Sequence, residues 1–503
     1  MPQLNRSTHP APVLPERVLQ FGTGVLLRGL PDFFIDRANR QGLFRGSVVV
    51  VKSTGGSTDE FSEQDGLYTL VTRGSRKGQD VDEKEVVSAI SRVLSAQEQW
   101  KDVLKAAQNP HLQIVISNTT EVGIQYVEEN IFQNPPQSFP AKLTAFLYER
   151  FRNFGGSKHK GMVVIPTELV VDNGLKLREI VERLAKYNEL GKLFNKWLKY
   201  HVRFCNSLVD RIVPGKPDAD IHGQLEQELG YEDKLLIVAE PYRLWAIEGD
   251  ERVREMLSFA GADEGVIIDE DISFYRERKL RLLNGTHTLT VPLAYLLGLQ
   301  TVYESSTHPL MRPFIERIML DEIAPTVPSD ALGDEGPAAV RAFANQVLDR
   351  FQNPHIEHFL LNITLQQTSK MQARNLPTLQ RYVAKFGQAP SHMTLGFAAF
   401  LRFMRAVRVE EGQYLGEIDT SSGTITYPIR DDYADYFYRR WQQTETGDAG
   451  AVREMVRQIC GDTTLWGTDL NQLTGFAEAV ADRLTDLLTQ GPEAVLERQL
   501  AMV

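Results

Sequence analysis

The turn Gly22-Thr23-Gly24 constrains the fold of this chain more than any other feature of its sequence. It ends a short apolar run at residues 17–21 and precedes a helical pattern, in which apolar residues recur at steps of three and four as far as residue 38. Residues 47–52 (SVVVVK) are apolar and β-branched, which is typical of a strand buried on both faces. Strand, glycine turn, helix and strand in this order open a doubly wound nucleotide-binding unit.

The same alternation continues towards residue 240. Helical periodicity covers residues 139–154, and short apolar runs predict strands at 112–117, 161–166 and 235–240. The segments 68–74 and 81–87 are typical of an inserted hairpin. We therefore predict an α/β fold for this part of the chain, with a Rossmann-like parallel sheet.

After residue 270 the sequence becomes mostly helical. The pattern from 272 to 298 predicts one long helix, and the later exceptions are a loop at 326–337 and a hairpin at 416–429 that turns at Ser421-Ser422-Gly423. We place the domain boundary near residue 280. Residues 1–280 would form a Rossmann-like dinucleotide-binding domain, and residues 281–503 a mostly α-helical substrate and catalytic domain.

The composition excludes several classes of protein. Apolar residues make up 42% and charged residues 24% of the 503, as in an ordinary soluble globular chain. The net charge of −11 argues against nucleic-acid and anionic-membrane partners, which bind basic surfaces. Two cysteines (Cys205 and Cys460), a polar start without a leader pattern and no apolar run of about 18 residues predict a cytoplasmic protein. The oligomeric state stays open.

A nucleotide-binding loop is the first candidate site. Gly22 and Gly24 would let the backbone approach a pyrophosphate at the start of the helix. Leu27 stands where the usual third glycine is, and Gly29 comes two residues later, so a tight turn without a ligand explains the pair equally well. The second strand ends in Lys52 and not in the acid that binds the ribose of NAD. NADP therefore stays open beside NAD, as does a merely solvated lysine.

The strongest cluster of candidate catalytic residues is Lys279-x4-Asn284-x2-His287, inside the predicted long helix. Offsets of five and eight residues place these side chains within about 140° of one another around an α-helix. The lysine would take an alcohol proton, the amide would donate to the developing alkoxide, and the imidazole would orient a second hydroxyl. Burial and neighbouring arginines would lower the pKa of the lysine. A solvated basic helix face is the alternative.

Other residues are weaker candidates. His355 and His358 have a metal-like spacing, but we expect them at the surface because they follow Asn353-Pro354. Cys205 is better explained as a buried structural residue than as a nucleophile. The chain has neither a Ser-His-Asp pattern nor the cysteines of a zinc dehydrogenase, so we predict that it uses no metal.

Several motifs, in order along nearly the whole chain, resemble the polyol-specific long-chain dehydrogenases, the family of mannitol dehydrogenase. They are residues 15–29 (PERVLQFGTGVLLRG), 117–121 (SNTTE), 204–214 (FCNSLVDRIVP) and 239–245 (AEPYRLW), with the Lys-x4-Asn-x2-His spacing itself. The resemblance implies a Rossmann-like domain, a helical C-terminal domain and a site in the cleft between them. It also implies metal-independent hydride transfer between a nicotinamide cofactor and a sugar alcohol or sugar acid.

The resemblance further implies roles for single residues. Lys279 would be the general acid/base, and His287 would bind a substrate hydroxyl. Asn284 would hold the reacting oxygen, with Asn173 as a second donor. NAD would be the cofactor, although Lys52 departs from the acid that NAD-preferring members often carry. The cofactor-binding residues, within a loop at 18–29 and beyond it, would be Phe21, Gly22, Thr23, Gly24, Val25, Leu26, Lys52, Asn118 and Thr119.

Within the family the likeness is greatest to members acting on hexuronates, which implies interconversion of D-tagaturonate and D-altronate in galacturonate breakdown. A guanidinium is the natural partner of a uronate's carboxylate, and the candidates are Arg402, Arg374 and Lys370. Fructuronate or a neutral ketose such as fructose is an alternative substrate. A catalytically silent sugar-acid or dinucleotide-binding regulator is another alternative, although the intact Lys-x4-Asn-x2-His spacing argues against it.

Overall fold

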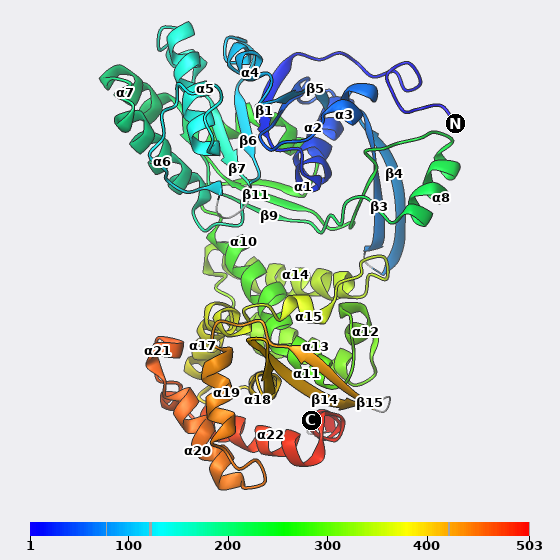
Figure 1. Cartoon of the computed structure of the whole chain (residues 1–503), viewed down its shortest axis with the longest axis vertical. Coiled ribbons are helices and arrows are strands. Elements are labelled where there is room, and N and C mark those ends of the chain that lie inside the picture. The colour runs from blue at the N-terminus through cyan, green and yellow to red at the C-terminus, as the bar shows by residue number, and fades with distance from the viewer. Residues whose placement is uncertain (77, 120–122, 421–422, 502–503) are drawn as a thin grey trace. The chain divides into compact units, whose positions relative to one another are not determined.

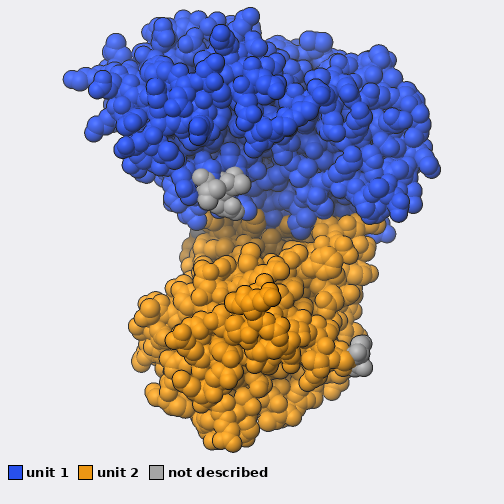
Figure 2. Space-filling view, viewed as in Figure 1, with its two compact units in different colours: residues 1–74, 79–272 blue, residues 75–78, 273–503 orange. Residues whose placement is uncertain are grey.

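The computed structural model describes residues 1–76, 78–119, 123–420 and 423–501. Internal contacts divide the chain into two compact units (Figure 2). Residues 1–74 and 79–272 form unit 1, and residues 75–78 and 273–503 form unit 2. This division falls after residue 272, whereas the sequence pattern suggests a boundary near 280. Among the described residues, no helix is both long and apolar enough to cross a membrane.

A six-stranded parallel sheet is the centre of unit 1 (Figure 1). Its strands are β1 (Glu16–Phe21), β2 (Ser47–Lys52), β5 (Ile90–Ser95), β6 (Ile114–Ser117), β7 (Val163–Pro166) and β8 (Arg203–Phe204). They lie in the order β5-β2-β1-β6-β7-β8 and pair in parallel throughout. Counted along the chain this is the order 3-2-1-4-5-6, which confirms the predicted Rossmann-like fold. The order reverses between β1 and β6, and such a switch point is where ligands bind.

Nine α-helices accompany the strands of unit 1 in the part that the structure describes. The helical pattern after the glycine turn breaks at Leu30 (φ −135°, ψ −79°), because Pro31 starts a new helix and has no N–H to continue the first. Two helices therefore replace the single predicted one. The helices are α1 (Val25–Gly29), α2 (Pro31–Arg40), α3 (Asp59–Glu63), α4 (Trp100–Ala106), α5 (Phe139–Asn153), α6 (Asn173–Tyr187), α7 (Lys192–His201), α8 (Ala219–Leu229) and α9 (Glu251–Met256).

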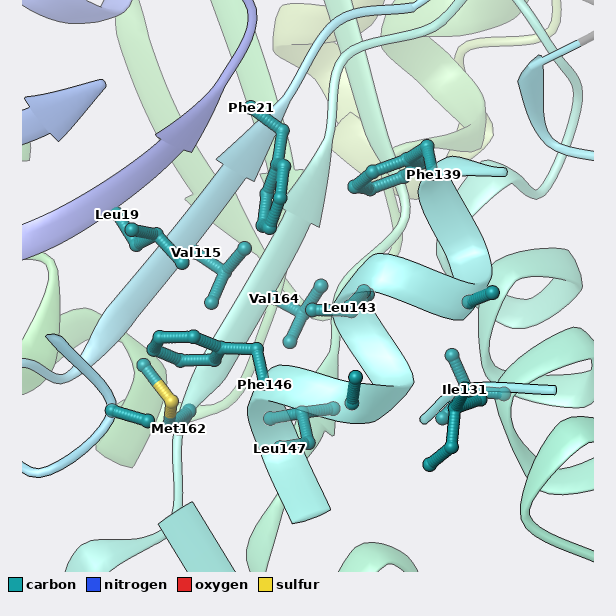
Figure 3. Packing of buried hydrophobic residues seen from close by; sticks show 14 of the residues in the cluster. Leu19, Phe21, Val115, Ile131, Phe139, Leu143, Phe146, Leu147, Met162 and Val164 are labelled. Carbon is teal, nitrogen blue, oxygen red and sulfur yellow. The ribbon is translucent and has the colours of Figure 1, made fainter. Parts of the chain in front are cut away.

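Helix α5 shows how the helices cover the sheet (Figure 3). Its side chain Phe146 packs in one buried cluster with Leu19 of β1, Val115 of β6 and Val164 of β7. Full burial of such a side chain contributes about 1.5–3 kcal/mol. The helix starts where Ser138 accepts a hydrogen bond from the backbone N–H of Ala141, as an N-cap residue does.

Two small sheets complete unit 1. One has the order β10-β3-β4, with β10 (Ile237–Ala239), β3 (Tyr68–Arg76) and β4 (Gln79–Val87), and the other has the order β12-β11-β9, with β12 (Val266–Asp269), β11 (Leu244–Glu248) and β9 (Ser207–Asp210). The predicted inserted hairpin is thus β3 and β4. The predicted strand at 235–240 is β10, which pairs with β3 of this hairpin and not with the main sheet. The two-residue strand β8 takes the edge position and is too short to give a pattern.

The predicted long helix at 272–298 is three segments of different helical geometry. They are α10 (Ser273–Arg278), the π-helix η4 (Lys279–Gly285) and α11 (Thr286–Leu296). Hydrophobic periodicity does not reveal the π-helix, because its i→i+5 hydrogen bonds cover only seven residues. Two further π-helices follow in the described part of unit 2, η5 (Ile318–Ile323) and η8 (Met371–Asn375).

The rest of unit 2 is mostly helical, as predicted. The predicted loop at 326–337 contains the 3-10 helix η7 (Asp330–Glu335). The α-helices are α12 (Val302–Thr307), α13 (Met311–Arg317), α14 (Gly336–Phe351), α15 (Leu360–Ile363), α16 (Gln367–Lys370), α17 (Leu376–Phe386), α18 (Ser391–Phe403), α19 (Ala434–Gln442), α20 (Ala449–Cys460), α21 (Thr463–Trp466), α22 (Phe476–Gln490) and α23 (Pro492–Ala501).

One antiparallel sheet interrupts these helices. The predicted hairpin is β14 (Gln413–Thr420) with β15 (Gly423–Pro428), and β13 (Ala406–Glu410) adds a third strand beside β14. Its predicted turn residues Ser421 and Ser422 lie outside the described residues.

Candidate functional site

The glycine turn of unit 1 has a backbone that only glycine adopts readily. Gly22 has φ +127°, and a Cβ there would lie 2.9 Å from Cδ1 of Leu27 and 3.0 Å from the carbonyl oxygen of Asn118. Its N–H donates to the carbonyl of Val51 at 3.0 Å, which ties the turn to β2. A Cβ on Gly24 would meet nothing within 4 Å. The turn therefore leaves an open backbone face at the switch point of the sheet.

The missing third glycine of the fingerprint has a structural explanation. In Rossmann folds this glycine allows close packing between helix and strand. Here Leu27 occupies its place in the sequence and is fully buried in the core beside Gly22. Gly29 provides the close approach instead, because a Cβ there would lie 2.9 Å from Cγ2 of Val213.

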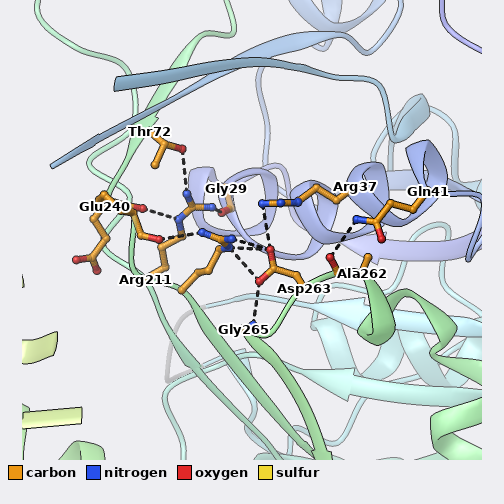
Figure 4. Close-up of polar contacts among 11 residues, drawn as sticks. Gly29, Arg37, Gln41, Thr72, Arg211, Glu240, Ala262, Asp263 and Gly265 are labelled. Carbon is orange, nitrogen blue, oxygen red and sulfur yellow. Dashed lines mark hydrogen bonds and ion pairs between the residues drawn. The ribbon is translucent and has the colours of Figure 1, made fainter. Parts of the chain in front are cut away.

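A buried polar network holds the end of α1 and explains two of the sequence motifs (Figure 4). Arg211, from the motif at 204–214, donates to the carbonyl of Gly29, to Thr72 Oγ1 at 3.2 Å and to the carbonyl of Glu240 at 3.0 Å. Glu240, from the motif at 239–245, accepts from the backbone N–H of Ile212 at 2.6 Å. These two motifs therefore hold the last residue of α1, the helix that follows the glycine turn.

Arg243, also from the motif at 239–245, belongs to the same network. Its guanidinium binds the buried carboxylate of Asp263 at 2.7–3.1 Å, and Arg37 of α2 contacts that carboxylate at 3.2 Å. A carboxylate shared by two guanidiniums is a well-compensated buried charge.

The predicted cofactor-binding residues at the strand ends all lie at the carboxyl edge of the sheet. Lys52 Nζ donates to the carbonyl of Ser57 at 2.8 Å, so its ammonium folds back on the following loop. Asn118 donates to Thr167 Oγ1 at 2.9 Å, and Thr119 donates from both its N–H and its hydroxyl to Glu168 at 2.9 and 3.0 Å. Residues Thr120 and Glu121 of the same motif lie outside the described residues.

Glu168 is a buried acid beside the predicted cofactor-binding residues, and the sequence analysis did not single it out. It follows β7, is 2% exposed, and accepts hydrogen bonds from Ser117 and Thr119. Burial raises the pKa of its carboxyl, and the hydrogen bonds oppose that rise. The only available sequence signal was its position at the carboxyl end of a predicted parallel strand.

Asn173 is engaged by the backbone around it. Its amide nitrogen lies 3.0–3.1 Å from the carbonyls of Pro166, Glu168 and Ser207, and its oxygen accepts from the N–H groups of Gly174 and Ser207 at 2.9 Å. An amide nitrogen carries two hydrogens, and these three carbonyls engage both hydrogens of Asn173. The predicted donation from Asn173 to a reacting oxygen would require these bonds to break, so we leave it out of the proposed catalytic set.

The π-helix η4 in unit 2 places Lys279 and Asn284 on successive turns. The angle of about 140° expected from α-helical geometry does not apply, because a π-helix has more residues per turn and brings residues five apart closer together in angle. Both side chains are half-buried. Among the described residues, the side-chain amide of Asn284 has no hydrogen-bond partner, in contrast to that of Asn173.

The π-helices η4 and η8 bind each other through side chains. Arg281 donates to the carbonyls of Ala373 and Arg374 at 2.8 and 2.7 Å, and Asn375 donates to the carbonyl of Gly285 at 3.0 Å. A π-helix disturbs the regular α-helical ladder of hydrogen bonds. Here each π-helix supplies donors for carbonyls of the other.

His287 lies within a group of basic side chains that we name the basic cluster: His287, His358, Arg350, Lys370 and Arg374. Its ring stacks on Phe351 at a centroid distance of 4.2 Å and contacts the ring of His358 edge-on at 5.6 Å. Burial first, and then the other members of the cluster, hold the pKa of His287 well below its ordinary value. The imidazole is therefore neutral at pH 7. The expectation that His358 lies at the surface is wrong, and its contact with His287 was not visible in the sequence.

Two of the three predicted carboxylate-binding cations belong to the basic cluster. Lys370 donates to the carbonyl of Ile363 at 2.9 Å, and burial and then the charge of Arg374 lower its pKa to about 8. Arg374 donates to Thr288 Oγ1 at 3.2 Å, one residue beyond His287. These two cations, with Arg350, make the cluster suited to an anion.

Arg402, the third predicted carboxylate-binding cation, lies apart from Arg374 and Lys370. It lines a pocket beside Leu296 at the far end of α11, nine residues or about 14 Å along the helix from His287. An arginine on an apolar helix predicts that the side chain has a function, but the sequence does not show which residues surround it in the fold.

The cysteines carry no chemistry of this site. Cys205 and Cys460 are both buried free thiols, and burial raises the pKa of each to about 12. The predicted burial of Cys205 is confirmed, and a raised pKa makes a thiol less reactive. Among the described residues, no three His, Cys, Asp or Glu side chains are grouped so that they could hold a metal ion.

Comparison with known proteins assigns the family. The mannitol dehydrogenase Rossmann domain matches residues 16–261, and the mannitol dehydrogenase C-terminal domain matches residues 271–488. The chain is 40% identical over 484 residues to the altronate oxidoreductase of Halalkalibacterium halodurans, covering 95% of this chain and 92% of that protein. It is 38% identical over 488 residues to that of Bacillus subtilis, covering 96% and 95%. It is also 37% identical over 502 residues to that of Pectobacterium carotovorum, covering 99% of each.

Solved structures agree on the fold. A ternary complex of Pseudomonas fluorescens mannitol 2-dehydrogenase with NAD and D-mannitol is 22% identical, with a TM-score of 0.68 over all of both chains. A D-sorbitol dehydrogenase is 19% identical, with a TM-score of 0.76 over 98% of this chain and 100% of the other. At these identities the likeness establishes the fold alone. With both family domains matched in order and relatives near 40% identity over almost its whole length, the chain belongs to the mannitol dehydrogenase family.

Proposed function

We propose that this chain is an NAD-dependent altronate oxidoreductase, which interconverts D-altronate and D-tagaturonate by hydride transfer without a metal. The basic cluster carries the proposal, because it surrounds a neutral His287 and begins three residues after Asn284. A uronate offers both hydroxyls for a neutral imidazole and a carboxylate for the cations. The relatives named altronate oxidoreductase, at 37–40% identity, support the same substrate.

The glycine turn fits a dinucleotide. Gly22 provides a strained, tightly packed backbone where a Cβ would clash, and Gly24 leaves the space beside it open. The residues that would hold NAD are Gly22 to Leu26 with Asn118, Thr119 and Lys52, so unit 1 would be the dinucleotide-binding domain and unit 2 the substrate domain. When bound, NAD would supply the hydride acceptor for oxidation of the alcohol carbon, and its reduced form NADH would supply the hydride donor for reduction of the ketone.

The residues of unit 2 would handle the proton and the substrate. The amine of Lys279 would take the proton of the reacting hydroxyl during oxidation and return it to the carbonyl oxygen during reduction. The amide of Asn284 would donate to that oxygen as its negative charge develops. His287 would bind a neighbouring hydroxyl.

The carboxylate would be bound at the other side of His287. Arg374 presents a planar fork for a two-point contact, and Lys370 adds a point charge. Burial disfavours the charged forms of Lys370 and Arg374 and lowers the pKa of both, so a bound carboxylate would stabilise these cations.

We also place the protein in the cytoplasm, with small sugar acids as its partners. Both cysteines are free thiols, which fits a reducing compartment.

The test is turnover of NADH and NADPH by the purified chain, without added metal, against D-tagaturonate, D-fructuronate and D-fructose. We expect turnover with tagaturonate and NADH. A preference for NADPH would assign Lys52 to a 2′-phosphate. Turnover on fructuronate or fructose alone would move the protein to a related activity. Binding of NADH without turnover of any substrate would favour a silent regulator.

A Lys279→Met variant separates catalysis from binding. It should lose turnover and keep its affinity for NADH. The matched control is Lys101→Met, on the exposed face of α4, which should leave both unchanged. Full activity in Lys279→Met would refute the proposed proton transfer.

A further inference from the structure

A pocket at the far end of the helical unit contains two arginines that the proposed function does not use. It has a volume of about 230 Å³. Arg402, from the end of α18, and Arg405, just beyond it, provide its positive charge. Leu296, Ile418, Leu487, Leu488, Gly491, Pro492 and Asp419 complete the lining.

Both guanidiniums lack an acidic partner among the residues that the structure describes. Arg402 makes one long hydrogen bond, from Nη2 to the carbonyl of Glu417 at 3.4 Å, and its Nη1 is buried without a partner. Arg405 lies over the ring of Trp441 at 5.5 Å. Burial and then the charge of Arg402 lower the pKa of Arg405. Two cations held near each other without compensation are costly unless an anion joins them.

The one acid in the lining does not compensate them. Asp419 is exposed, and its carboxylate accepts from the hydroxyl of Thr424 across the β14–β15 hairpin at 2.7 Å. The pocket therefore keeps a local positive charge in a chain whose net charge is −11. Leucine, isoleucine, glycine and proline make up the rest of its lining.

We propose that this pocket is a second ligand site, which binds a small dianionic metabolite through its phosphate or carboxylate groups. Guanidiniums bind such oxyanions through paired, charge-assisted hydrogen bonds, and two of them match a double negative charge. A volume of 230 Å³ corresponds to about eight water molecules, which suits an anion with a short carbon skeleton over the apolar wall. The site is separate from the basic cluster, since the length of α11 lies between them.

Isothermal titration of the full chain with inorganic phosphate, glycerol 3-phosphate and succinate tests the proposal. We expect saturable binding of at least one of them. Tighter binding of glycerol 3-phosphate than of inorganic phosphate would assign the ligand to phosphate monoesters, and preference for succinate would assign it to dicarboxylates. The absence of saturable binding by all three would overturn the proposal.

Variants locate the binding. Arg402→Gln and Arg405→Gln should each weaken binding at least tenfold. The matched control is Arg408→Gln, which removes an exposed arginine already paired with Glu410 and Glu417, and it should change binding less than twofold. Arg402→Lys, which keeps the charge, guards against a folding defect by retaining part of the affinity. If Arg374→Gln abolishes binding while Arg402→Gln does not, the anion binds in the basic cluster and the second site does not exist.

Discussion

The stability of unit 1 should depend on the protonation of one buried acid, Asp32. It is the second residue of α2 and is fully buried. One carboxyl oxygen accepts from Gln20 at 3.2 Å, and the other has no hydrogen-bond partner among the described residues. Burial raises the pKa of Asp32 from 3.8 to about 7, although Gln20 and the charge of Arg28 oppose the rise. The folded protein therefore holds this proton at a pH where the unfolded chain has lost it.

The sign and size of the effect follow from that difference in pKa. Well below pH 3.8 the carboxyl of Asp32 is protonated in both the folded and the unfolded state, so it does not lower the free energy of unfolding. As the pH rises towards 7, unfolding releases a proton, so the free energy of unfolding falls by about 1.4 kcal/mol per pH unit, or about 4 kcal/mol in total. An asparagine side chain at this position would be neutral at every pH. Asp32→Asn should therefore stabilise the protein by up to about 4 kcal/mol at pH 8 and change it little at pH 4.

The assay is urea unfolding at pH 4, 6 and 8. A chain of two units need not unfold in one step. The unfolding transition of unit 1 is therefore compared between the variant and the unchanged protein, apart from that of unit 2. The matched control is Asp36→Asn, which removes a carboxylate that is satisfied by Ser88 and Arg40 and should destabilise the protein at pH 8. An equal effect of Asp32→Asn at all three values of pH would refute the reasoning.

Three further predictions concern the site. Gly22→Ala should weaken NADH binding at least tenfold in an equilibrium titration. It adds a Cβ 2.9 Å from Leu27 at φ +127°, and such strain costs about 1–3 kcal/mol. Unchanged affinity would contradict the proposal that the glycine turn binds the dinucleotide. Asn284→Ala should lower kcat about 10²–10³-fold, as loss of one oxyanion donor does. Asn173→Ala should mainly lower the melting temperature. A loss of kcat in Asn173→Ala and a lower melting temperature alone in Asn284→Ala would show that Asn173 is the catalytic donor and Asn284 the structural residue. Above pH 8, KM for tagaturonate should rise as Lys370 loses its charge; Lys370→Met should raise KM and flatten this rise, and a parallel rise in the variant would exclude Lys370 as its cause.

The sheet could be predicted from the sequence because its signals are local. A β-branched run such as residues 47–52 and a glycine turn each report the conformation of a few neighbouring residues. The basic cluster could not be predicted in the same way. His358 and Arg350 reach His287 from positions more than sixty residues away, and nothing in their own segments indicates the contact. Arg402 shows the converse, because the sequence marks it as a charge on an apolar helix but does not show which residues surround it in the fold.

The position of Asn284 depends on a segment far along the chain. A π-helix persists only when its altered carbonyls find other donors. Arg281 and Asn375 provide them, and Gly285 permits the approach, since a Cβ there would lie 3.2 Å from Nδ2 of Asn375. Hydrogen bonds of this kind contribute about 1–3 kcal/mol each. The relative placement of Lys279 and Asn284 thus depends on η4 and η8 together. Their spacing in the sequence identified the two residues but did not predict the π-helix that carries them.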